Sequence, residues 1–192
     1  MHLEAAKRVF RYLKQTVDLH LEYSPRTVTD FPIAENQLWG YVDSDWAGCP
    51  DDRRSTSGYV LMLNGAAISW RSKRQSVHAL SSAEAEFIAA SSVVQEVIFL
   101  RRLLSELGFP QQTSTPIFAD NETCIRWSQG AVGESERAKH IDLRRHFVHA
   151  ASDQGILQLR KVDSKLNSSD ILTKPFVDIP LFQRHRQSLM GF

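Results

Sequence analysis

The chain has 192 residues, of which 42% are hydrophobic and 23% charged, an ordinary composition for one globular domain with a short appendage. A net charge of +1 excludes a basic field over the whole molecule, so any nucleic-acid binding must use local patches. Two cysteines far apart in sequence form neither a disulfide framework nor a zinc motif, and they fit a reducing compartment.

The first 37 residues differ in pattern from the rest. Apolar residues at helical spacing predict an amphipathic helix over residues 2–15, and the alternation over residues 19–23 is compatible with a short strand. Residues 24–37 contain two prolines and are predicted to be a loop.

Three strands are predicted next, over residues 38–43, 57–63 and 66–71, where apolar, β-branched and aromatic residues gather. Asn64-Gly65, between the second and third strands, is a typical two-residue hairpin turn. These two strands are therefore predicted to be antiparallel neighbours.

The remainder alternates between helices and strands. The predicted elements are a long helix at 82–107, a strand at 115–119, a helix at 121–128, a loop at 131–139, a helix at 142–153, a strand at 156–162, a loop at 163–167, a short helix at 168–174 and a terminal helix at 181–190. The order βββαβαβα predicts an α/β fold with a five-stranded mixed sheet flanked by helices, the first three strands being antiparallel.

No segment is predicted to span a membrane. The longest apolar region, residues 87–100, is interrupted by Gln95 and Glu96 and is too short for a bilayer. The charged N-terminus also lacks the apolar core of a signal peptide.

Two aspartates end predicted strands. Asp43 precedes a turn rich in Gly, Pro and Asp, and Asp120 directly follows the strand at 115–119, where α/β sheets place their ligand sites. The structural alternatives are that Asp43 and Asp45 cap the turn and that Asp120 caps the next helix.

Two further acids come from predicted helices. Glu86 lies on the stripe of the long helix that faces the sheet, whereas the capping-box pattern from Ser81 to Glu84 gives Glu84 a structural role, so Glu86 is preferred. Asp170 lies in the short helix near the C-terminus, where the alternative is a first-turn acid favoured by the helix dipole. Asp43, Glu86, Asp120 and Asp170 are thus the candidate catalytic and metal-binding residues.

Basic and polar residues flank these acids and are candidates for holding phosphates and sugars. The alternative for each is an ordinary solvated surface residue. Trp46 and Trp70 are expected in the core rather than stacked on bases. The substrate-binding candidates are Arg71, Lys73, Arg74, Gln75, Ser82, Asn121, Lys139, His140 and Arg144.

A zinc site is not favoured. His146 and His149 are three residues apart on one predicted helix and His140 precedes them, but no cysteine is nearby and no fourth ligand is evident.

The chain resembles ribonuclease H, and in particular the ribonuclease H domain of copia-type retrotransposon polyproteins. The resemblance covers residues 38–176, and residues 5–14 (AAKRVFRYLK) resemble the segment that joins reverse transcriptase to ribonuclease H. The motifs that carry it are residues 40–48 (GYVDSDWAG), 54–58 (RSTSG), 69–75 (SWRSKRQ), 81–86 (SSAEAE), 120–121 (DN), 139–142 (KHID) and 169–175 (SDILTKP).

The resemblance implies a connection segment at 1–37, a ribonuclease H domain at 38–176 and a C-terminal tail at 177–192. It implies that the four acids bind two Mg²⁺ ions, with Mn²⁺ as a substitute, one activating water and the other stabilising the leaving 3′ oxygen. The RNA strand of an RNA–DNA hybrid would be cut to 5′-phosphate products during reverse transcription. The implied partners are the hybrid and the reverse transcriptase domain of the same polyprotein, in cytoplasmic virus-like particles, with no membrane and no small-molecule cofactor.

One departure from the family pattern concerns the loop at 162–166, which lacks the histidine that many cellular ribonucleases H carry before their last aspartate. Either this group of proteins works without it, or another residue such as His140 or His146 substitutes.

Other functions remain as alternatives. One is a catalytically weak domain that binds hybrids or supports a polymerase, and another is a different nuclease of the same fold. The pattern Asp43-Ser-Asp45 also resembles an aspartyl-phosphate phosphatase, but Trp46 follows it. In a transposase or integrase the glutamate comes last, whereas here it comes second.

Overall fold

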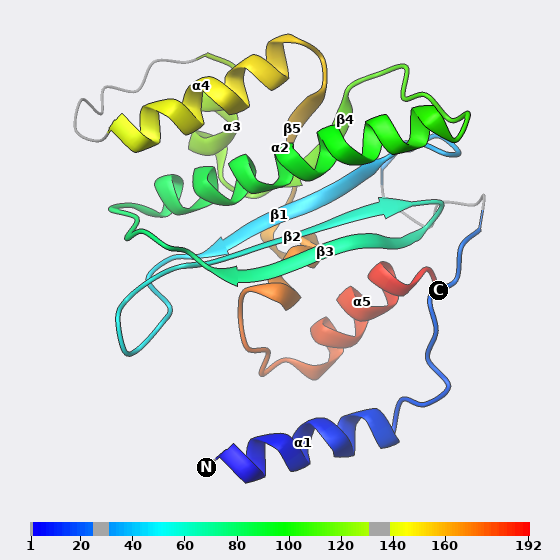
Figure 1. The fold of residues 1–192 in the computed structure, drawn as a ribbon. Helices are drawn as coiled ribbons and strands as arrows, with labels where there is room; N and C mark the ends of the chain where they lie inside the picture. Colours follow the sequence, from blue (N-terminus) through cyan, green and yellow to red (C-terminus); the bar gives the residue numbers. More distant parts are fainter. Residues whose placement is uncertain (1, 25–30, 131–138) are drawn as a thin grey trace.

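A five-stranded mixed sheet forms the centre of the computed structural model, which describes residues 2–24, 31–130 and 139–192, without the side chains of 139–142 (Figure 1). In space the strands follow the order β3-β2-β1-β4-β5. The pairs β1–β2 and β2–β3 are antiparallel, which confirms the prediction for the first three strands. The pairs β1–β4 and β4–β5 are parallel, so the sheet is mixed, as predicted. The strands are β1 (Trp39–Asp45), β2 (Thr56–Leu63), β3 (Ala66–Arg74), β4 (Thr115–Ala119) and β5 (Leu157–Lys161).

The central strand β1 is buried on both faces because helices pack on one face of the sheet and α5 (Ile179–Met190) with the 3₁₀ turns on the other. Alternate side chains of a strand point to opposite faces. Leu38 and Val42 therefore join the core on one face, while Trp39 and Tyr41 join the core on the other.

The turn between β2 and β3 confirms the predicted hairpin. Asn64 and Gly65 have φ values of +48° and +90°, the left-handed conformation that a type I′ turn requires at both central positions. Asn and Gly adopt this conformation at the lowest cost.

Three helices cover one face of the sheet: α2 (Ser82–Glu106), α3 (Glu122–Ser128) and α4 (Lys139–Asp153) (Figure 1). Alanine and valine residues along α2, together with Phe87, pack on the sheet and form the larger core with Val148 and Ala151 of α4. None of the described helices has the length and apolar character that crossing a bilayer demands.

The opposite face carries two 3₁₀ turns, η1 (Ser164–Leu166) and η2 (Ser168–Leu172), and helix α5 (Ile179–Met190). Here Trp39, Val60 and Phe118 form a second core, against which Leu172 and Leu189 pack. The segment predicted as a C-terminal tail thus contains a helix that contacts both η2 and β3. The domain boundaries proposed from the sequence stay a prediction.

Helix α1 (His2–Lys14) lies beyond α5 and buries none of its residues (Figure 1). The possible strand at 19–23 was wrong, because these residues pair with no strand. The backbone N–H of Glu22 instead donates to the carbonyl of Met190 at 2.8 Å, which ties the segment to the end of α5.

Candidate active site

Two parallel strands bring Asp43 and Asp120 together. The register pairs Gly40 with Ile117 and Tyr41 with Phe118, so two residues further along the strands Asp43 comes level with Asp120. Asp43 is only 1% exposed because it lies inside the central strand. Asn121, not Asp120, caps α3, since its side chain accepts the backbone N–H of Cys124 at 2.9 Å. The carboxylate of Asp120 is therefore not used as that cap.

Helix α2 brings the third carboxylate. Ser81 caps this helix by accepting the N–H of Glu84 at 3.1 Å, and Glu84 accepts the N–H of Leu80 at 2.8 Å, so Glu84 has the predicted capping role. Two residues on, Glu86 points to the sheet, and its Oε1 accepts the N–H of Ser44 at 3.2 Å.

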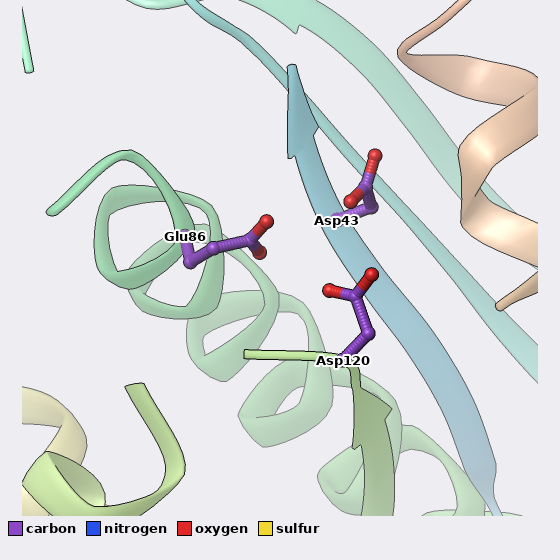
Figure 2. A group of neighbouring side chains, drawn as sticks. All are labelled: Asp43, Glu86 and Asp120. Atoms are coloured by element: carbon purple, nitrogen blue, oxygen red, sulfur yellow. The ribbon is translucent and has the colours of Figure 1, made fainter. Parts of the chain in front are cut away.

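The three carboxylates form one cluster, in which Asp43, Glu86 and Asp120 each offer an oxygen within 4.8 Å of the others (Figure 2). Burial, and then repulsion from Asp43 and Asp120, raises the pKa of Glu86 well above its ordinary value. The second oxygen of Glu86 is buried and has no hydrogen-bond partner among the described residues. Buried carboxylates this close together cost free energy unless a cation or a proton compensates their charge.

The turn that carries Asp170 is fastened to β1 by Asn167, which is fully buried. Its side-chain N–H donates to the carbonyl of Val42 at 3.0 Å, and its Oδ1 accepts the hydroxyl of Ser169 at 2.6 Å. Below the turn, Ser168 lies 3.2 Å from the buried His185 of α5. This network holds η2 against the residue that precedes Asp43.

Lys174 links Asp170 to Asp43 by forming an ion pair with each. The ammonium of Lys174 lies 3.0 Å from Asp170 Oδ1 and 3.3 Å from Asp43 Oδ2, and the hydroxyl of Thr173 donates to the same Asp43 oxygen. Burial, and then repulsion from Asp43, raises the pKa of Asp170 to about 6 in spite of Lys174. Burial opposes the charged form of Lys174, but attraction to Asp43 and Asp170 outweighs it and raises the pKa of Lys174.

The residues predicted from the sequence to bind substrate near β3 differ in their surroundings. Arg71, Lys73 and Arg74 are exposed, and Arg74 pairs with Asp52 at 3.4 Å. Gln75 is buried, and its amide donates to Ser57 Oγ at 2.8 Å and to the carbonyl of Ala85 at 2.9 Å. Through these two hydrogen bonds, Gln75 connects the end of β3 to β2 and to the first turn of α2.

The remaining candidates from the sequence lie on helices. Ser82 is exposed at the start of α2, Asn121 caps α3, and Arg144 is half-buried on α4. The side chains of Lys139 and His140 lie outside the described residues.

The prediction that Trp46 and Trp70 lie in the core was wrong, because their exposed fractions are 50% and 58%. The indole N–H of Trp46 donates to the carbonyl of Ala79 at 3.1 Å. Both side chains are open to solvent. Both are also close in sequence to residues of the candidate site.

Sequence reasoning missed Asn167, Thr173 and Lys174. All three lie in or beside a short segment whose contacts with β1 span more than a hundred positions in the chain. Local periodicity contains no sign of such contacts. The available signal was the Asn-Ser-Ser run, in which an Asn side chain commonly bonds the backbone two residues on.

The described histidines do not gather at a metal site. His149 lies 3.1 Å from Asp153 on the same helix, and the described residues contain one group able to hold a metal, namely Asp43, Glu86 and Asp120. A group made only of carboxylate oxygens suits Mg²⁺ or Mn²⁺ better than zinc. The unpaired oxygen of Glu86 supports this fit.

Comparison with known sequences identifies relatives. The chain is 39% identical over 173 residues to the retrovirus-related Pol polyprotein from transposon TNT 1-94 of Nicotiana tabacum, a match that covers 90% of the chain and 12% of the polyprotein. It is 35% identical over 174 residues to that from transposon RE2 of Arabidopsis thaliana, covering 91% of the chain and 11% of the polyprotein. The chain thus spans about an eighth or less of these relatives. No family model matches it.

Comparison with solved structures identifies the fold. The structure described as LC11-RNase H1 in complex with an RNA/DNA hybrid superposes with a TM-score of 0.54 at 15% identity, and the match covers 76% of this chain and 99% of that one. At this identity the likeness concerns the fold, which is ribonuclease H-like.

Proposed function

Because the chain is a homologue of copia-type retrotransposon Pol polyproteins and has a ribonuclease H-like fold, we propose that it is an endoribonuclease that cuts the RNA strand of RNA–DNA hybrids. The observation that carries the proposal is the cluster of Asp43, Glu86 and Asp120 at the carboxyl ends of β1 and β4. The solved structure of similar fold that contains an RNA/DNA hybrid supports the choice of substrate.

Asp43, Glu86, Asp120 and Asp170 would hold two divalent ions, Mg²⁺ or Mn²⁺. When bound, such ions polarise the phosphate and lower the pKa of bound water, which makes it a nucleophile at neutral pH.

The residues of the chain position these oxygens. β1 and β4 fix Asp43 and Asp120 in register, the capped start of α2 directs Glu86 to Ser44, and Asn167 fastens the turn of Asp170 to the carbonyl of Val42. A site assembled on packed elements keeps its geometry without reorganisation during the reaction.

We also propose that the domain works beside the reverse transcriptase of the same polyprotein, during reverse transcription in cytoplasmic virus-like particles. Its products would carry 5′-phosphates and 3′-hydroxyls.

The test is cleavage of a labelled RNA–DNA hybrid in Mg²⁺. Asp43→Asn and Glu86→Gln should each lower the rate by more than the ~10–100-fold that loss of an outer-shell partner costs, because each removes a charged metal ligand. The matched control is Glu84→Gln, since a glutamine at this position still accepts the N–H of Leu80 and keeps the cap.

Circular dichroism would verify that all three variants keep the native fold. If Glu86→Gln cuts as fast as Glu84→Gln, the metal assignment fails. If the unmodified chain binds the hybrid but never cuts it, the domain is a hybrid-binding part of the polyprotein.

A further inference from the structure

Lys174 places a cation among the acids of the site. Its ammonium lies 3.0 Å from Asp170 Oδ1, 3.4 Å from Asp43 Oδ1 and 3.3 Å from Asp43 Oδ2. One ammonium therefore bridges two carboxylates that come from different elements of the fold. The two acids would otherwise repel each other.

Local backbone geometry fixes this arrangement. The N–H groups of Thr173 and Lys174 both donate to the carbonyl of Asp170, at 3.1 and 3.0 Å, so the chain makes one further turn after η2. Residues four apart lie on the same side of such a turn, which puts the lysine above the aspartate. Pro175 then ends the turn.

The cluster is consequently asymmetric. Lys174 contacts Asp43 and Asp170, whereas Glu86 on the far side of Asp43 keeps a buried oxygen without a partner among the described residues. On one side of the site an ammonium contacts the carboxylates directly. On the other side the ammonium of Lys161 donates to the backbone carbonyl of Asp120, and among the described residues no ion pair reaches Glu86.

An ammonium and a divalent ion compete for the same oxygens. Mg²⁺ needs carboxylate oxygens at about 2.0–2.1 Å, and the like charge of a lysine a few ångströms away opposes its entry. The lysine is tethered, so it competes at a high local concentration. Its side chain is 39% exposed and is therefore able to withdraw.

We propose that Lys174 is a built-in cation, and that a divalent ion binds between Asp43 and Asp170 only when this ammonium withdraws. The position bounded by Asp43, Glu86 and Asp120 fills first, because Lys174 pairs with only one of its three acids. This inference rests on the proposed function, because it concerns the order in which the same site is loaded.

The surroundings of Lys174 indicate what draws it away. It lines a groove of about 960 Å³ between α1 and α5, whose other basic residues are Arg8, Arg11 and Arg186 and whose lining includes no acid among the described residues. A withdrawn ammonium is repelled there unless phosphates are present. A phosphate-bearing strand therefore favours loading of the ion, and by linkage the ion favours binding of the strand.

The experiment is calorimetric titration of the full chain with Mg²⁺ and with Mn²⁺, without nucleic acid. Lys174→Met should tighten the weaker of the two binding events by about tenfold or more, the size expected when one nearby charge is removed from a partly solvated site. The matched control is Lys165→Met, which removes the same charge from an exposed position in η1 and should change neither event.

Two further measurements complete the test. Mg²⁺ should raise the melting temperature of Lys174→Met more than that of the unmodified chain, because bound metal replaces the lost counter-charge. A hybrid with a 2′-O-methylated, uncleavable RNA strand should tighten metal binding in the unmodified chain, and should do so less in Lys174→Met.

Equal metal affinities in Lys174→Met and the unmodified chain would overturn the inference, as would the absence of divalent binding in both. Neither outcome depends on cleavage. If the unmodified chain cuts hybrids but Lys174→Met binds metal no more tightly, only the role of the lysine is refuted. If Lys174→Met binds metal more tightly but the unmodified chain never cuts hybrids, only the proposed nuclease activity is refuted.

Discussion

The buried carboxylate of Glu86 costs the folded chain free energy. Burial and two neighbouring acids raise the pKa of Glu86, and burial and Asp43 raise that of Asp170 to about 6. An acid whose pKa is higher in the folded state than in the unfolded chain destabilises the fold when it ionises. Its contribution to the free energy of unfolding is therefore fully present below the unfolded pKa of about 4, and is lost as the pH rises through the folded pKa. Without metal, the chain should therefore become less stable from about pH 4 to beyond pH 6.

Glu86→Gln should raise the melting temperature in EDTA, because a neutral amide replaces a carboxylate that resists ionisation. Each kcal/mol gained corresponds to about 2–4 °C in a chain of this size. The gain should grow as the pH rises, since the cost that it removes appears only when Glu86 ionises. Thermal unfolding followed across this pH range would measure both effects, and a lower melting temperature at neutral pH would contradict the assigned burial penalty.

Among elements, η2 depends on the absence of a side chain at Gly58. Gly58 is the register partner of Asp43 in β2, and a Cβ there would lie 2.6 Å from Thr173 Cγ2 and 2.9 Å from Leu172 Cβ. Those distances are too short for real carbon atoms, so the turn rests directly on the bare backbone of β2. The packing of two elements thus sets the position of Asp170.

Gly58→Ala should push η2 away from the sheet and lower hybrid cleavage by about a hundredfold, the cost of a misplacement of about 1 Å in an active site. Gly108→Ala is the control, because it strains a residue with φ of +90° in a place with nothing within 4 Å. Both variants lose stability, but only the first should lose activity at a temperature where both are folded. Equal activities would show that η2 tolerates the shift.

The elements themselves were largely predictable, for reasons visible in single residues. Asn64-Gly65 signals its turn locally, and the stripe that ends in Glu86 identifies which acid of α2 faces the sheet. Lys174 was not predictable, because its ion pair with Asp43 joins residues that only the folded sheet brings together. Trp46 and Trp70 were misjudged because aromatic character indicates burial only on average.

For the molecule as a whole, the basic residues of β3 are divided between the two faces of the sheet. Arg71 pairs in register with Tyr59, whose ring joins the core beneath α2, while Arg74 alternates to the face on which Ser72 donates to the carbonyl of Leu172 in η2. Arg74 therefore shares its face with the Asp170 turn. The two arginines are expected to contribute unequally to hybrid binding.

Arg74→Ala should reduce the salt dependence of hybrid binding by about one phosphate contact, and Arg71→Ala by less. Titrations with an uncleavable hybrid at several salt concentrations would measure both slopes. Arg102→Ala is the matched control, because this exposed arginine of α2 pairs with Glu106 in the same way as Arg74 pairs with Asp52. Equal slopes for Arg74→Ala and Arg102→Ala would remove Arg74 from the binding surface.

The support that α5 gives to the Asp170 turn has a consequence for biosynthesis. Because His185 lies beneath Ser168, a chain still on the ribosome cannot hold this turn in place before α5 has left the exit tunnel. The Asp170 turn would therefore be the last part of the candidate site to form during synthesis.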